Sequence, residues 1–279
     1  MTSAPSKYGF STRNMVMALI VILIAAIYWP PQPPRNLVAE FAAITNEAFE
    51  QINTFDLPAT YVIMDHTVTC RRTANIVERS FVFENNGAQI VTGLRDFGEK
   101  IMKAGNTLQA MYRKVSYIFE TFQTEFQMIL DDKSKFSDIG IERLIRLITE
   151  FREQVVQIKV SIQDAENLHK NIEQYLLNGQ KEAAKLINAD DDVGAMAVKD
   201  ELDSIKAIFV CLQKAGTNLD MTIKVLRDYL SKASKINAKM GNNIYLVTEE
   251  DLVYLAKSLK DLQIHHRNFM RKDSSINEV

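Results

Sequence analysis

The sequence predicts an all-α protein: an elongated antiparallel bundle of three long helices and two shorter ones, preceded by one N-terminal hydrophobic segment. Three observations lead to this fold class. Only 6 of the 279 residues are proline, and four of these lie between residues 30 and 34, which leaves the rest of the chain free to form long helices. Apolar residues recur at alternating steps of three and four along most of the chain, as in helices packed side by side. Residues 15–29 form an uncharged run that is apolar or interfacial throughout.

The N-terminal part is divided into a short basic tail (1–14), the hydrophobic segment (15–29) and a Pro-rich spacer (30–35). At ~1.5 Å per residue, a helix of this length spans roughly 22 Å, less than a typical hydrocarbon core. Thin bilayers tolerate short spans, and an aromatic pair at its end suits a membrane interface. The residues expected to make the membrane segment include Met15, Leu19, Ile22, Ala26, Tyr28 and Trp29.

A cleaved signal peptide is the competing interpretation of this segment, because it too has a basic start and a short apolar run. A cut after Ala26 would place Ile24 where a small residue belongs, so a retained anchor is favoured over a cleaved leader. The basic flank predicts a cytosolic N-terminus and a single pass. The endomembrane system is favoured as the location, although the absence of an N-x-[ST] sequon after the segment counts against a lumenal body. A mitochondrial membrane stays open because the start is free of acidic residues and contains Ser and Thr.

A bundle domain is predicted over residues 36–270. Asn36 is a candidate cap for a first helix that runs from Leu37 to Ile52, and Pro58 interrupts the pattern after it. A less regular helical pattern covers 61–83, where β-branched and aromatic residues are frequent. The Asn-Asn-Gly sequence at 85–87 indicates a break.

The next helix carries the most regular pattern in the chain. One set of residues is spaced by seven and a second set is offset by three, which is the a/d pattern over six heptads. Glycines in the first set would allow close approach of two backbones or leave room for a bulky partner. The first set is Val91, Gly98, Gly105, Tyr112, Phe119 and Phe126; the second is Leu94, Ile101, Leu108, Val115, Phe122 and Ile129.

Two further long helices follow after a turn predicted at 131–140. Asn178-Gly179 is expected to bend or end the first of them, and an acidic loop is expected at 188–194. Gly241 begins a stop, and Thr248 with Asp251 resembles a capping box before a last helix that extends to about residue 270. Residues 271–279 are predicted to be a polar tail. The core stripe of these two long helices includes Leu144, Phe151, Ile158, Leu212, Leu219 and Leu226.

Motifs of catalysis are absent from the sequence, and neither a cofactor nor a metal is predicted. Cys70 and Cys211 are interpreted as small apolar residues rather than as a disulfide. His169 lies on a core stripe three residues after Glu166, but a di-iron bundle needs a second copy of that pair. Asp190–Asp192 does not fit a calcium loop, because Ala195 occupies the position of the turn glycine. No catalytic residue is therefore assigned.

Charge further limits the classes of function. The first 39 residues carry three basic residues and no acidic one, so the acidic excess lies in the body and nucleic acid is not an expected partner. The sequence favours a membrane-anchored scaffold, tether or adaptor that acts through protein–protein contacts and is not an enzyme. The alternative is a secreted or membrane-active helical protein, such as a pore former, with a cleaved leader. A homo-oligomeric coiled coil is the rival to a bundle formed within one chain.

Overall fold

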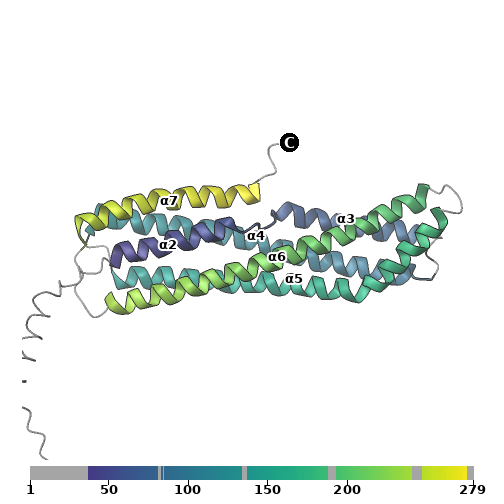
Figure 1. Ribbon diagram of the computed structural model, residues 1–279, viewed down its shortest axis with the longest axis horizontal. Helices are drawn as coiled ribbons and strands as arrows, with labels where there is room; N and C mark the ends of the chain where they lie inside the picture. The colour runs from purple at the N-terminus through teal and green to yellow at the C-terminus, as the bar shows by residue number, and fades with distance from the viewer. Residues whose placement is uncertain are drawn as a thin grey trace, which may run out of the picture. The chain divides into compact units, whose positions relative to one another are not determined.

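The computed structural model describes residues 37–80, 83, 85–133, 137–187, 193–240 and 247–274, and it is helical (Figure 1). The all-α prediction is confirmed for this part of the chain, but three shorter helices accompany the three long ones rather than two. Residues 36 and 15–29, with the predicted cap and membrane segment, lie outside the described residues. The chain divides into two units, Met1–Leu37 and Val38–Val279. The helices are α2 (Leu37–Thr54), α3 (Thr60–Arg79), α4 (Gly87–Asp131), α5 (Asp138–Ile187), α6 (Val193–Met240) and α7 (Glu249–Ser274).

Helices α2 and α3 follow each other end to end and together run beside α6 in the opposite direction (Figure 1). Ion pairs between these helices show the direction. Residue numbers increase along α2 and α3 while those of their α6 partners decrease, so the helices are antiparallel. Lys232 Nζ lies 2.9 Å from Glu47 of α2, and Arg72 of α3 lies 2.7 Å from Glu201. Short connections also place α4 against α5 and α5 against α6, as the predicted antiparallel arrangement requires.

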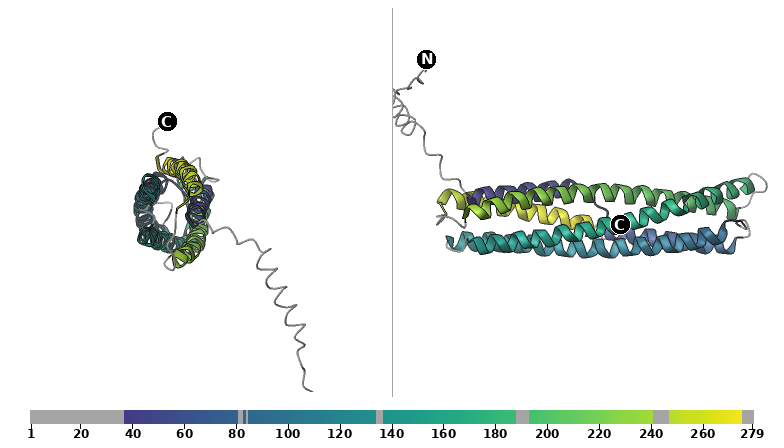
Figure 2. Two further views of the ribbon diagram at one scale, coloured as in Figure 1. Left: turned by 90° about the vertical axis from the view of Figure 1, so that its left-hand side faces the viewer. Right: turned by 90° about the horizontal axis from the view of Figure 1, so that it is seen from below.

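Helix α7 lies along α4 over only part of its length. The ring of Phe269 lies 5.3 Å from that of Tyr112, and the ring of His266 lies 4.9 Å from that of Phe119. The unit 38–279 therefore has two parts, visible in Figures 1 and 2. We call them the four-helix half, made of α3 with the adjoining parts of α4, α5 and α6, and the five-helix half, in which α2 and α7 replace α3.

The core side chains of α4 change in size between the two halves. In the four-helix half, a Cβ added at Gly98 would lie 3.3 Å from Cys70 Cβ, so the two backbones approach closely. Five helices enclose a wider core than four, and aromatic rings fill it in the five-helix half. The rings of Phe49 and Phe119 lie 4.3 Å apart there. The other buried rings of this cluster are Phe41, Phe122, Phe126 and Tyr229.

The breaks between the long helices differ in part from the prediction. Helix α5 continues through Asn178 and Gly179 to Ile187, so it does not end there. Gly179 has a packing role instead, since an added Cβ would lie 2.7 Å from Ile90 Cδ1. Helices α5 and α6 begin at Asp138 and Val193, so the last residues of the segments predicted as a turn (131–140) and an acidic loop (188–194) are helical. Residues 134–136 and 188–192 lie outside the described residues.

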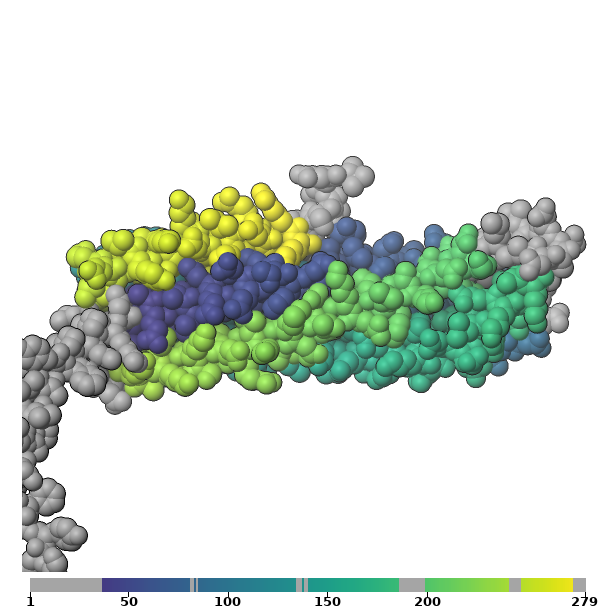
Figure 3. Space-filling view, viewed as in Figure 1, coloured from purple at the N-terminus to yellow at the C-terminus, as the bar shows by residue number. Residues whose placement is uncertain are grey.

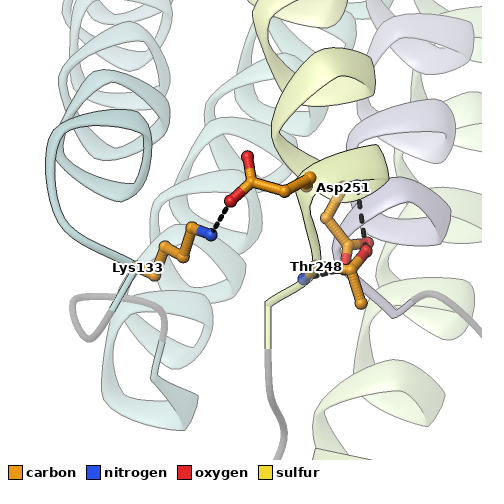
Figure 4. Close-up of polar contacts among 4 residues, drawn as sticks. Lys133, Thr248 and Asp251 are labelled. Carbon is orange, nitrogen blue, oxygen red and sulfur yellow. Dashed lines mark hydrogen bonds and ion pairs between the residues drawn. The ribbon is translucent and has the colours of Figure 1, made fainter.

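The capping box at the start of α7 is confirmed (Figure 4). Thr248 N donates to Asp251 Oδ2 over 2.7 Å, and Asp251 N donates to Thr248 Oγ1 over 3.2 Å. Lys133 forms an ion pair with Glu249 and so ties the end of α4 to the start of α7. The far end of α7 extends to Ser274, so the first residues of the predicted tail are helical.

Candidate functional site

Polar side chains from several helices meet at the junction between α2 and α3. Lys272, at the end of α7, donates to the carbonyl oxygens of Asn53 over 2.6 Å and of Phe55 over 2.7 Å. A cation placed at the last carbonyls of a helix satisfies acceptors that have no partner within that helix. Burial lowers the pKa of Lys272, while nearby Asp56 raises it.

Two other helices bind the same junction. The Tyr112 hydroxyl of α4 donates to Pro58 O over 3.1 Å, and Asn218 Nδ2 of α6 donates to Asp56 O over 2.6 Å. The junction is thus held from α4, α6 and α7 at once. Proline removes one backbone donor and prevents a continuous helix, and the surrounding side chains compensate for the exposed carbonyls.

A cleft of about 360 Å³ opens at this junction, lined by both charged and apolar residues. Lys214 Nζ lies 2.5 Å from Asp56 Oδ2 at its edge, and this contact lowers the pKa of Asp56 and raises that of Lys214. Cys211 is half-buried in the wall, where burial raises the pKa of its thiol. A thiol that is held protonated is a poor nucleophile, so the cleft has no activated cysteine.

An apolar groove of about 790 Å³ continues from the cleft along α3, and Tyr61 and Val62 line both. Its wall includes Met64 and Val68 of α3 together with Gln109 of α4. Tyr61 and Val68, seven residues apart, have exposed fractions of 43% and 60%. Side chains spaced by seven share one helix face, so the groove offers an accessible apolar strip about two turns long. The sequence pattern did not predict this groove, although Tyr61 and Val68 are spaced by seven, as residues on one helix face are.

The eleven residues chosen for the core stripe are all buried, each with an exposed fraction of 3% or less, and none lines the cleft. Leu108, Ile158 and Leu219 come together behind Pro58, around a small apolar void. The eleven core-stripe residues are Leu94, Ile101, Leu108, Val115, Phe122, Leu144, Phe151, Ile158, Leu212, Leu219 and Leu226. The six membrane-segment residues, Met15, Leu19, Ile22, Ala26, Tyr28 and Trp29, lie outside the described residues.

His169 is a packed core residue. Its ring stacks on Phe209 with 4.2 Å between centroids, Nδ1 has no hydrogen-bond partner, and burial lowers its pKa. Glu166 Oε1 lies toward Gly216 on the neighbouring helix. Within the described ranges, no three His, Cys, Asp or Glu residues come together as metal ligands. Both cysteines are free, and the acidic residues 190–192 fall in a gap of the described chain.

The adjacent histidines of α7 make different contacts. His266 lies over Phe119, with Nε2 3.1 Å from Ser116 Oγ and Nδ1 3.3 Å from Gln123 Nε2. Its neighbour His265 contributes a backbone oxygen that accepts a hydrogen bond from Asn53 over 2.9 Å. Both residues thereby attach α7 to the bundle, and neither faces a site together with the other.

Comparison with protein-family models and with curated proteins gives no match. In the part of the chain that the structure describes, no helix combines the length and the apolar character needed to cross a bilayer.

Proposed function

We propose that this protein is a membrane-anchored helical scaffold or tether that binds an amphipathic helix of a protein partner in the apolar groove of α3. The anchor is residues 15–29, an uncharged apolar run that ends in the aromatic pair Tyr28 and Trp29. The observation that carries the binding proposal is the accessible strip formed by the exposed Tyr61 and Val68, with the half-buried Met64 between them. Large apolar side chains gathered on an otherwise polar surface mark interaction sites.

A helix fits the groove, because the groove lies on the continuation of the α4 surface against which α7 packs. Along α4, α7 lies beside Phe119 and then Tyr112, and its Lys272 reaches the cleft next to Tyr61. The next stretch of α4 in that direction contains Gln109, which lines the groove, and Gly105, over which Met64 packs. A partner helix with apolar residues three and four apart would extend the α7 packing there.

The binding proposal is tested with a matched pair of variants of the full chain. Val68→Glu and Val210→Glu each add one charge at a side chain of nearly equal exposure, 60% and 59%, on α3 and α6. We expect Val68→Glu to reduce partner recovery in proximity labelling at least tenfold, while Val210→Glu leaves it unchanged. A photo-crosslinker at Tyr61 should then form an adduct with a helical segment of the same partner. Equal recovery with both variants would contradict the groove as the binding site.

The anchor is tested separately by carbonate extraction of cell membranes. The full chain should stay in the membrane pellet, and a variant with Leu19→Glu and Ile22→Glu should be released, because charges in a hydrocarbon core are costly. A wild-type chain that washes off, or whose mature form begins near Ile27, would contradict the anchor and leave the groove proposal standing.

A further inference from the structure

The outward face of α7 differs from the faces that pack against α2 and α4. Helix α7 lies at the surface along the upper edge of Figures 1 and 3. Residues at steps of four and three on this face are all exposed, and at about 100° per residue they fall within an arc of about 80°. We call them the outer stripe: Val253, Lys257, Lys260, Ile264, Arg267 and Arg271.

The outer stripe is basic and partly apolar. None of its four cationic side chains forms an ion pair with another described residue. Asp261 lies about 80° from the centre of the arc, so no acidic residue interrupts the stripe between its ends. Val253 is 74% exposed and Ile264 is 44% exposed. Some exposed lysines elsewhere in the bundle are paired, such as Lys232 with Glu47, and others, such as Lys206 and Lys235 of α6, form no ion pair with another described residue.

We infer that the outer stripe binds the anionic headgroup surface of a lipid bilayer. It extends over 18 residue steps from Val253 to Arg271, roughly 27 Å at the helical rise, so it can lie flat on a planar surface. Basic residues remain hydrated among lipid headgroups while their apolar stems and isolated apolar neighbours enter the interface. Each Lys or Arg near such a surface strengthens binding by about fivefold.

An acidic partner helix fits the outer stripe less well than a lipid surface does. A packed helix–helix interface needs apolar residues at most of the three-and-four positions, and only Val253 and Ile264 are apolar here. A helix packed on the stripe would bury Lys260 and Arg267 between itself and α7. Burying these charges carries a desolvation cost that headgroup binding avoids. The inference goes beyond the proposed function, because an anionic surface would attract α7 whether or not residues 15–29 span a bilayer.

The test uses a parent chain, the full-length protein with Leu19→Glu and Ile22→Glu so that insertion of residues 15–29 does not contribute, and two charge-reversal variants of this parent with the same change in net charge. The α7 variant carries K257E, K260E, R267E and R271E. The control variant carries K206E, K224E, R227E and K235E, four exposed basic residues on α6. Binding is measured by flotation with phosphatidylcholine vesicles, with and without phosphatidylserine, and circular dichroism verifies that each variant is folded. The measured quantity is the ratio of binding to anionic and to neutral vesicles.

We expect the parent and control chains to favour anionic vesicles by at least tenfold, with the preference lost in the α7 variant and weakened by added salt. An equal ratio in all three chains would overturn the inference, and so would an equal loss in both variants. Binding of the wild-type chain, with Leu19 and Ile22 intact, to neutral vesicles reports the N-terminal anchor, so its absence would count against the anchor alone. An α7 variant that keeps its preference for anionic vesicles but loses a protein partner would overturn the lipid assignment in favour of an acidic protein.

Discussion

At the scale of single residues, the glycines of the long helices decide how closely the helices approach one another. Gly93 on α4 lies against Ile172 of α5 so tightly that an added Cβ would lie 2.4 Å from Ile172 Cγ2 and 3.1 Å from Ile172 Cβ. Gly216 on α6 has ordinary space, with Glu166 Oε1 at 3.5 Å and Ile162 Cγ2 at 3.7 Å from the added atom. Both are helical, so alanine at either position gains the same intrinsic helix stability and differs only in packing.

Alanine at these two glycines should therefore shift stability in opposite directions. Gly93→Ala is expected to lower the free energy of unfolding by about 1–2 kcal/mol, because overpacking outweighs the gain in helix propensity. Gly216→Ala is expected to raise it by about 0.5–1 kcal/mol. Urea unfolding followed by circular dichroism measures both. A higher free energy of unfolding in both variants would show that packing at Gly93 is looser than the distances indicate.

His169 should make the stability of the bundle fall in mild acid. Burial lowers its pKa below the ordinary value of 6.5, so the unfolded chain takes up the proton at a higher pH than the folded chain does. Its contribution is present above about pH 6.5 and is lost as the pH falls toward the lower folded pKa. His169→Phe, which keeps a ring against Phe209, should reduce the dependence of the melting temperature on pH between 7 and 5. A part should remain, because burial also lowers the pKa of His66 and His266. His265→Gln is the control and should leave that slope in place.

At the scale of elements, α7 shows what can be predicted from local sequence and what cannot. Its start was predictable, because Thr248 and Asp251 lie three residues apart and act on neighbouring backbone groups. Its role at the α2–α3 junction was not, since Lys272 and Asn53 are far apart in sequence. Gly179 was misjudged for the same reason: glycine commonly ends a helix, but here its lack of a side chain accommodates Ile90 from α4.

Loss of the α7 cap should loosen this helix without unfolding the bundle. Asp251 is fully buried and accepts hydrogen bonds from the Thr248 backbone and hydroxyl, so Asp251→Ala leaves these donors unpaired. We expect a loss of about 1–2 kcal/mol and faster amide hydrogen exchange in α7 than in α4 or α5. Glu250→Ala, a change at an exposed neighbour, is the control. Uniformly faster exchange in all helices would instead indicate that α7 and the bundle unfold together.

At the scale of the unit 38–279, the number of helices around the core was the part that the sequence left open. Heptad spacing determines which side chains turn inward, and the eleven chosen residues are indeed all buried. The pattern does not state how many helices share the core, because a/d spacing serves bundles of several sizes. Along the core face of α4, Gly98 and Gly105 give way to Phe119 and Phe126 where the core becomes wider and five helices enclose it instead of four. This change could be interpreted only once α7 was placed beside α4.

A bundle completed within one chain should be distinguishable in solution from a coiled coil completed by a second chain. Lys159 on α5 and Asp220 on α6 are close enough for an ion pair, 2.5 Å between Nζ and Oδ1. With Cys70 and Cys211 replaced by alanine, a chain carrying Lys159→Cys and Asp220→Cys should react with a short bismaleimide to give a monomer that migrates faster in denaturing gels. The control chain carries Lys159→Cys on α5 and Val253→Cys on α7. The short bismaleimide should not join these two positions within one chain, whereas a longer linker should. A covalent dimer from the first pair at low protein concentration would mean that α5 of one chain packs against α6 of another. Exchange of identical helices between chains would give such a dimer, because it preserves every contact but makes it between chains.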